Sequence, residues 1–159
     1  MQLTYVSIKS NANTTEFTMP MITVRYATAQ RKSGLTEMIA KAASRLSADI
    51  LHKNRLLTAV TVEQIAPEDW FIGDKSLTRH GLASFWLDIR IVDGTNTREE
   101  KAAFVAATFA KMSELLGPLH NESYVHVNDV RGDAYGYGGL TQNERYFAGK
   151  MKAPNAAAA

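Results

Sequence analysis

The side chains that could do chemistry lie mostly on two predicted strands. Arg90 could hold a carboxylate through a bidentate contact, or it could pair with Asp88, two residues away on the same face. Tyr124 and His126 also share one face, and a tyrosine hydroxyl or a neutral imidazole can polarise a carbonyl oxygen as enolate charge develops. A tyrosine of the core and a hydrogen-bonded interface histidine are the simpler alternatives for this pair.

Other kinds of site are excluded by what the chain lacks. It contains no cysteine, so disulfides, thiolate metal sites and thiol nucleophiles do not arise. Its histidines have no metal-ligand spacing and no matching acidic cluster, so we expect no metal and no cofactor. The YGYGG run at 135–139 is not a phosphate loop, because no Lys-Ser/Thr opens a helix after it.

Composition indicates one ordinary globular domain. The chain has 159 residues, 45% of them hydrophobic and 21% charged. Eighteen basic against 16 acidic side chains leave a net charge of +2 with no basic stripe, so we expect no nucleic-acid partner. No apolar run reaches the ~18 residues of a membrane span, and the first 18 residues do not resemble a signal peptide. We therefore expect a cytoplasmic protein.

The chain contains an internal repeat. A shift of 65 residues aligns two halves without a gap, and it places Arg25 over Arg90. The segment 59–66 falls on 124–131, and the sequence WFIG at 70–73 falls on YGYG at 135–138. Each half therefore repeats a strand, a helix, a second strand and an aromatic–glycine turn.

Periodicity assigns these elements. Apolar residues alternate in the first strand of each half, and helices of ~18–20 residues follow. The expected helical stripes are Leu35, Ile39, Ala42, Leu46 and Ile50 in the first helix, and Phe104, Val105, Phe109, Met112, Leu115 and Leu116 in the second. Thr97 and Glu100 form a predicted capping box. A right-handed crossover makes the strands within each half parallel.

The predicted fold class is α/β, or α+β in some schemes. Two tandem β-α-β units form a four-stranded sheet with two helices on one face. The other face carries Trp86, Tyr124 and His126 and has no cover in a monomer, which favours a closed oligomer.

The domain boundaries follow from the repeat. Residues 1–18 form a polar extension, disordered or upstream of the true start, and residues 19–148 form a single domain with repeats at 20–77 and 85–142. Residues 149–159 are expected to be a flexible tail.

These features together resemble a known family. Met19-Pro20 leads directly into a strand, and doubled β-α-β units with aromatic–glycine turns follow. The pattern over residues 19–148 resembles the tautomerase superfamily, and within it the tandem-fused 4-oxalocrotonate tautomerase-like proteins. The resemblance implies a homotrimer with sites at subunit boundaries and, after removal of Met19, a catalytic base at the nitrogen of Pro20.

Pro20 suits that role only as a free amine. An α-amine starts at a pKa of ~7.7–8.0, and burial or nearby cations lower it. With 19 residues before it, Pro20 is a tertiary amide without basicity. We therefore expect the native chain to start at Met19, or the extension to be cleaved. A proline at the head of a strand is otherwise a common structural feature.

The resemblance also suggests residues that bind substrate. Arg31 follows the first strand, where short tautomerases carry a substrate-binding arginine, and Arg25 and Arg90 are further carboxylate candidates. Trp70 and Tyr137 belong to the turns that wall the pocket in the family. Solvated arginines and aromatic side chains at the sheet edge are the structural alternatives.

The function predicted is that of a cofactor-independent tautomerase. It would move a proton in small 2-keto or 2-hydroxy-dienoic mono- or dicarboxylic acids, with Pro20 as base and Tyr124 and His126 as polarising groups. A dehalogenase, hydratase or decarboxylase with the same site is the alternative, with Glu63 as the acid available on the second strand. A non-catalytic trimeric binding protein is the third possibility, if Pro20 stays acylated.

Overall fold

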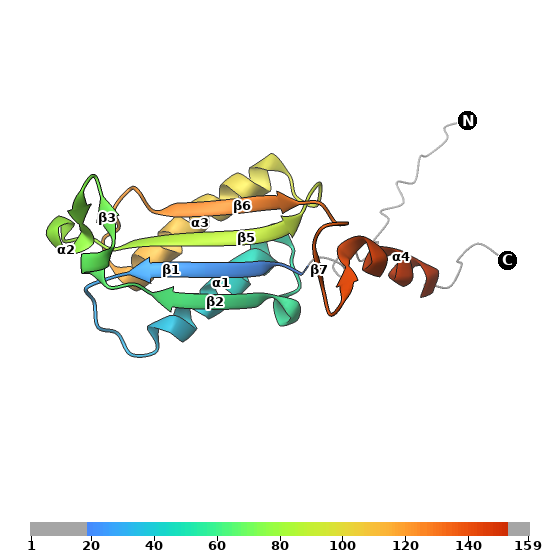
Figure 1. The fold of residues 1–159 in the computed structure, drawn as a ribbon, viewed down its shortest axis with the longest axis horizontal. Helices are drawn as coiled ribbons and strands as arrows, with labels where there is room; N and C mark the ends of the chain where they lie inside the picture. Colours follow the sequence, from blue (N-terminus) through green and yellow to red (C-terminus); the bar gives the residue numbers. More distant parts are fainter. Residues whose placement is uncertain (1–18, 153–159) are drawn as a thin grey trace, which may run out of the picture.

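A four-stranded sheet with two helices on one side forms the body of the protein (Figure 1). The computed structural model describes residues 19–152, and the predicted extension 1–18 and the tail after residue 152 lie outside this range. The elements are β1 (Met21–Ala27), α1 (Leu35–Leu51), η2 (Arg55–Leu57), β2 (Ala59–Gln64), η3 (Pro67–Asp69), β3 (Phe71–Ile72), β4 (Lys75–Ser76), α2 (Leu77–His80), β5 (Ser84–Val92), α3 (Arg98–Leu116), β6 (Tyr124–Val130), β7 (Gly136–Tyr137), β8 (Leu140–Thr141) and α4 (Gln142–Lys152).

The two halves are built alike. β1 pairs with β2 in parallel, with Met21 opposite Ala59, and β5 pairs with β6 in parallel, with Trp86 opposite Tyr124. The second pair lies 65 residues after the first, so the register of the strands follows the sequence repeat. The predicted tandem β-α-β fold is confirmed.

The halves join through β1 and β5, which run antiparallel in the sheet order β2-β1-β5-β6. Thr23 lies opposite Asp88 in this pairing, and these two residues are also counterparts in the repeat. An approximate two-fold axis therefore passes between them. The start of β1 lies beside the end of β5, where Met21 is opposite Arg90.

A tight hairpin ends each half. Phe71 pairs with Ser76 in the first hairpin, and Gly136 pairs with Thr141 in the second. Both turns have two residues of positive φ, Gly73 and Asp74 in one and Gly138 and Gly139 in the other. This geometry is that of a type I′ turn and explains the repeated glycine.

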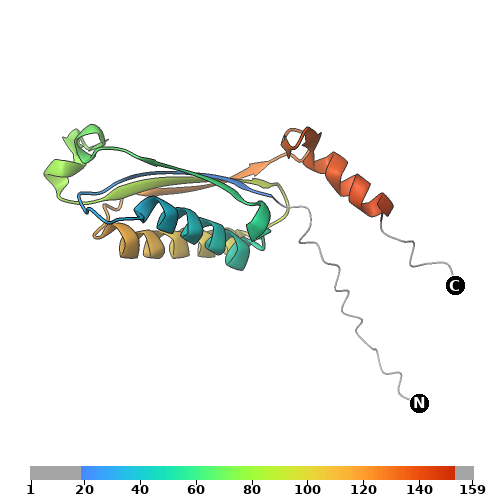
Figure 2. The same cartoon turned by 90° about the horizontal axis from the view of Figure 1, so that it is seen from below.

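The core lies between the sheet and the two helices (Figure 2). Ile22, Val24 and Tyr26 of β1 are buried against it, and so are the alternate residues Phe85, Leu87, Ile89 and Ile91 of β5. The capping box of Thr97 and Glu100 at the start of α3 is present, as predicted.

The helical stripes differ in part from the expected ones. The buried line of α1 is Leu35, Ile39, Ala43, Ser47 and Leu51, while Ala42, Leu46 and Ile50 are only partly buried beside it. Val105 of α3 is 40% exposed, so the prediction that it belongs to the core is wrong. Each helix packs on the sheet along one line of residues. Side chains one position away from that line point sideways along the sheet and are only partly covered.

Helix α4 projects beyond the sheet and reaches Lys152, past the boundary predicted at residue 148 (Figure 2). The counterpart in the first half, α2, ends at His80. No helix among the described residues is long and apolar enough to cross a membrane.

A buried glutamine of the second half takes the place of a buried leucine of the first half. Gln142 begins α4 at the position of Leu77, and both residues are buried. Both polar atoms of the Gln142 amide lack a hydrogen-bond partner within residues 19–152. A buried amide without partners costs about 1–3 kcal/mol.

We predict that Gln142→Leu raises the free energy of unfolding by about 1 kcal/mol or more, because it removes the unpaired amide. The matched change Leu77→Gln should lower it by about 2 kcal/mol or more. Urea unfolding followed by circular dichroism measures both. Destabilisation by Gln142→Leu would contradict this account and show that the amide is hydrogen-bonded in solution.

Candidate active site

Pro20 is buried and directly precedes the first residue of β1. It lies close to the second hairpin, β7–β8. Its carbonyl accepts a hydrogen bond from the Ala59 amide, 3.3 Å away, which fixes it beside the start of β2. The hydroxyl of Tyr135 donates a hydrogen bond to the carbonyl oxygen of Met19 over 3.0 Å. That carbonyl belongs to the peptide bond that acylates Pro20, so Tyr135 lies directly at the nitrogen of interest.

Tyr135 is held in place by its own hairpin. Its carbonyl accepts a hydrogen bond from the Gln142 amide over 2.8 Å, as the carbonyl of Trp70 does from Leu77 in the first half. Burial raises the pKa of the Tyr135 phenol, while a backbone hydrogen bond at Met21 and the charge of Arg90 oppose this rise. The phenol therefore stays protonated at neutral pH and can donate a hydrogen bond.

Arg90 places a cation beside the start of β1. It lies opposite Met21 in the β1–β5 pairing, and its charge acts on Tyr135. Its Nε is 3.9 Å from Oδ1 of Asp88, while Oδ2 of Asp88 is 3.2 Å from Nδ1 of His126. Both sequence alternatives for Arg90 are therefore compatible with its position, since the contact with Asp88 is long and the side chain is 57% exposed.

Tyr137 belongs to the same hairpin as Tyr135. The guanidinium of Arg145 lies over its ring at 3.7 Å and also donates two hydrogen bonds to its carbonyl oxygen. Tyr137 is therefore held from α4, at the edge of this site. The structure thus brings Pro20, Arg90 and the hairpin of Tyr137 to one end of the sheet.

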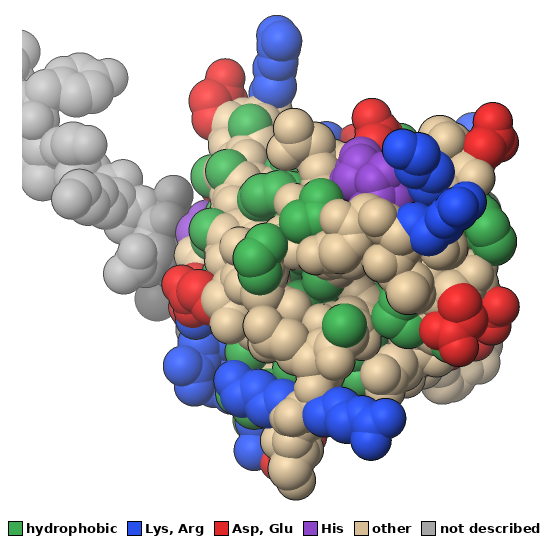
Figure 3. All heavy atoms as spheres, turned by 90° about the vertical axis from the view of Figure 1, so that its left-hand side faces the viewer, with side chains coloured by type: hydrophobic (Ala, Val, Ile, Leu, Met, Phe, Trp, Pro, Cys, Tyr) green, Lys and Arg blue, Asp and Glu red, His purple; other side chains and the backbone are tan. Residues whose placement is uncertain are grey.

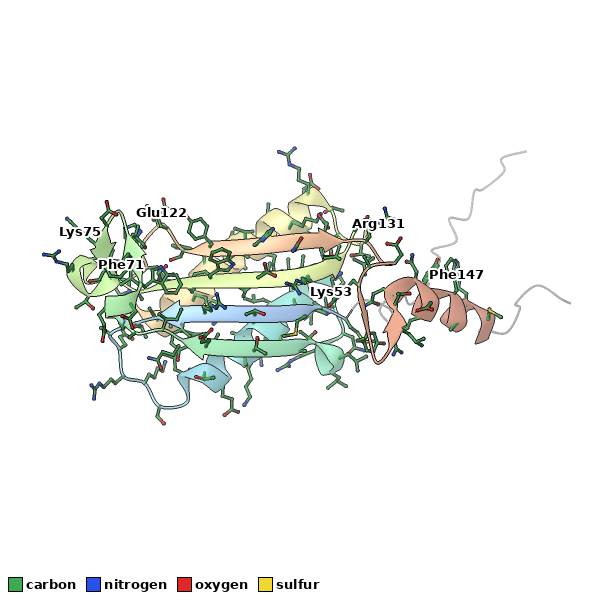
Figure 4. All side chains as sticks on the ribbon, in the orientation of Figure 1. Lys53, Phe71, Lys75, Glu122, Arg131 and Phe147 are labelled. Carbon is green, nitrogen blue, oxygen red and sulfur yellow. The ribbon has the colours of Figure 1, made fainter. Side chains whose placement is uncertain are left out.

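The remaining predicted residues lie away from Pro20 in the same subunit. Arg25 and Tyr124 both lie opposite Trp86 of β5. Trp86 is four residues from Arg90 along this strand, a distance of about 13 Å. Trp70 lines an open groove with Trp86 and Tyr124, so it is not a wall for Pro20 of its own subunit. Figure 4 shows Phe71, Lys75 and Glu122 at that far end.

Two of these distant residues already have partners. Nε of Arg25 donates a hydrogen bond to the Glu63 carboxylate over 3.0 Å. Glu63, the acid considered above for activating water, is therefore also paired. The Tyr124 hydroxyl donates to the Glu122 carboxylate, and this bond raises the pKa of Tyr124. Arg31 follows the far end of β1, so it cannot meet Pro20 within one subunit.

Tyr135 is the residue that sequence reasoning missed. The repeat places it at the position of Trp70, and this was the available signal. The sequence pattern instead indicates Tyr137 for the pocket wall. Tyr135 lies at this site because the antiparallel pairing of β1 with β5 brings the second hairpin to the start of β1.

Solved structures share this fold. A fused 4-OT in a symmetric trimer (Q0) superposes with a TM-score of 0.66 at 18% identity, covering 77% of this chain and 96% of that one. Pt0534, inactivated by 2-oxo-3-pentynoate, gives a TM-score of 0.68 at 13% identity, covering 79% and 98%. The chain has the fused 4-OT fold. The resemblance inferred from sequence to the tandem-fused form of the tautomerase superfamily is confirmed at the level of the fold.

The same fold is found in a macrophage migration inhibitory factor-like protein from Entamoeba histolytica. It gives a TM-score of 0.63 at 15% identity, covering 77% of this chain and 98% of that one. No family model and no curated protein sequence matches the chain. The fused 4-OT fold is thus formed here by a sequence only 13–18% identical to these structures.

A buried lysine lies at the same end of the sheet as Pro20 (Figure 4). Lys53 follows α1, is 3% exposed, and donates from Nζ to Oγ1 of Thr95 over 3.1 Å. Burial lowers the pKa of Lys53 to about 8, although the charges of Glu100 and Asp129 oppose this shift.

We predict that Lys53 makes the folded state more stable as pH rises. Between pH 8 and pH 10.5 the unfolded chain holds the lysine proton and the folded chain does not. The free energy of unfolding should therefore rise with pH across this window, by up to about 3 kcal/mol. Lys53→Met should lose this part of the rise in urea unfolding, whereas the exposed Lys41→Met should keep it. Identical pH profiles for the two variants would refute the assignment.

Proposed function

We propose that this protein is a cofactor-independent tautomerase of small 2-keto or 2-hydroxy-dienoic mono- or dicarboxylic acids, with the amine of Pro20 as its base. The observation that carries the proposal is the hydrogen bond from Tyr135 to the Met19 carbonyl. Loss of Met19 would place a secondary amine at this point, facing a phenol donor and a guanidinium.

The steps follow from these groups. The neutral nitrogen of Pro20 takes a proton from the carbon next to the substrate carbonyl, or from a dienol hydroxyl, and becomes cationic. Negative charge then develops on the carbonyl oxygen of the substrate, and the hydroxyl of Tyr135 can donate a hydrogen bond to it. Arg90 binds the carboxylate group, and Pro20 returns its proton to another carbon of the substrate.

The open face of the sheet supports a trimer. This face, turned away from α1 and α3, carries Trp86 at 49% exposure and Tyr124 at 52%, with ring centroids 6.0 Å apart. Structural relatives are described as trimers. In such an assembly Tyr124 and His126 would reach the Pro20 site of a neighbouring subunit, which would give Tyr124 a role although it lies toward the other end of the sheet from its own Pro20.

We predict that a chain beginning at Pro20 isomerises 2-hydroxy-dienoic acids, and that the chain retaining residues 1–19 is at least about 100-fold slower. Activity should rise with pH through one group titrating below ~7.7–8.0, because burial and Arg90 disfavour the protonated amine. Pro20→Ala in the same short chain should keep partial activity through its primary amine.

Two further variants act on the same site and serve as controls. Arg90→Ala should mainly raise KM for carboxylate substrates, by about tenfold, and should raise the titration point. Tyr135→Phe should lower kcat without changing the pH at which the amine titrates by more than a small amount. Full activity in a chain verified to retain residues 1–19 would contradict the proposal and leave His126 as the next base to test.

We predict a homotrimer that Trp86→Arg breaks. Light scattering at micromolar concentration should give the trimer for the unaltered protein and a folded monomer for the variant, because a charge would be buried in the interface. Val105→Arg, on the outer side of α3, should stay trimeric. A monomeric unaltered protein would remove the basis for a site shared between subunits.

A further inference from the structure

An open cavity lined by both apolar and polar side chains lies at the other end of the sheet from Pro20. It has a volume of about 1000 Å³, at the upper end of the range for small-molecule sites. The loop after β1 forms one side of it, and the segment from α2 to the start of β5 forms the other. We refer to it as the β1-end cavity.

The floor of the β1-end cavity is apolar and buried. It is formed by side chains that belong to the core or its edge: Tyr26, Leu35, Leu77, Ala83 and Leu116. The rim is polar and exposed, with Gln30, Arg31, Lys32 and Ser33 on one side and Gln64, Glu68 and Thr78 on the other.

The rim carries more positive than negative charge. Arg31 and Lys32 have no hydrogen-bond or ion-pair partner among residues 19–152, and Glu68 is the acidic residue in the lining. Figure 3, which views this end of the molecule, shows Lys and Arg side chains along its lower edge, where Figure 1 places the loop after β1. One cation remains in excess even if Glu68 turns toward the other.

The loop that carries the two cations is anchored at its root. The Thr28 hydroxyl donates to the Leu116 carbonyl over 2.9 Å and accepts a hydrogen bond from the Gln30 amide over 3.1 Å. The Gln30 side chain lies so close to Gly117 that a Cβ there would be 2.4 Å from its amide nitrogen. The end of α3 therefore positions this loop over the cavity.

The repeat shows that this end has no base like Pro20. Phe85 stands at the position of Pro20, is fully buried, and packs against Phe109 with ring centroids 6.4 Å apart. We propose that the β1-end cavity is a binding site, without turnover, for a small monocarboxylic acid with an apolar body, whose carboxylate is held by Arg31 and Lys32. The apolar floor receives the body, and the two unpaired cations hold the head group.

The proposal does not depend on Pro20 being a free amine, so the test uses the full chain. Hexanoate is the probe, hexan-1-ol is the uncharged comparator, and binding is followed by amide chemical shifts in NMR. Hexanoate should shift the amides of residues 28–35 and 77–83, and it should bind more tightly than hexan-1-ol.

A double variant and a control variant locate the binding. Arg31→Gln with Lys32→Gln should weaken hexanoate binding by about tenfold or more and leave hexan-1-ol unaffected, because only the carboxylate contacts are removed. Both residues are exposed and unpaired, so the fold should persist. Arg90→Gln, at the Pro20 end, should leave the shifts at residues 28–35 unchanged.

Two results would overturn the proposal. Equal affinity for hexanoate in the protein and in the double variant would show that the cations do not hold the head group. Shifts confined to the Pro20 end and abolished by Arg90→Gln would show that the acid binds at the proposed active site instead.

Discussion

The antiparallel pairing of β1 with β5 decides which parts of the chain can act together. Thr23 lies opposite Asp88 at the centre of this pairing. The start of β1 therefore lies beside the end of β5, and the start of β5 lies beside the end of β1. Pro20 therefore meets Arg90 and the hairpin of Tyr135, both from the second half. The first half contributes the strand that carries Pro20 and the neighbouring start of β2.

Strand faces, the parallel pairs and the turns could be predicted because they depend on alternation, on the handedness of the β-α-β crossover and on the repeated glycine. Alternation fixes which residues of β1 and β5 are buried, and the repeated glycine marks a turn that needs positive φ. The meeting of the two halves could not be predicted in this way. Periodicity assigns a side chain to a face, but it does not say which end of a strand a distant hairpin will cover. The sequence therefore groups Trp70 and Arg31 with Pro20, whereas within one subunit they lie toward the other end of the sheet.

The two ends of the sheet have the same backbone and different chemistry. Pro20 is matched by Phe85, Tyr135 by Trp70, and Arg31 by Asn96. Asn96 is used structurally, since its amide donates to the Leu51 carbonyl over 3.0 Å and to the Glu100 carboxylate over 2.9 Å. One end thus keeps a nitrogen that can become basic, and the other keeps two unpaired cations above an apolar cavity. The two roles that we propose, proton transfer and binding, are therefore assigned to opposite ends of the sheet.

The central claim is that Pro20 becomes the N-terminus, and a tryptic digest of the protein from its native source tests it most directly. Trypsin does not cleave after Met19, so a peptide running from Pro20 to Arg25 arises only if the chain already begins at Pro20. Our account predicts this peptide with an unmodified amine in the mass spectrum. A peptide running from Ser10 to Arg25, with no trace of the shorter one, would contradict it.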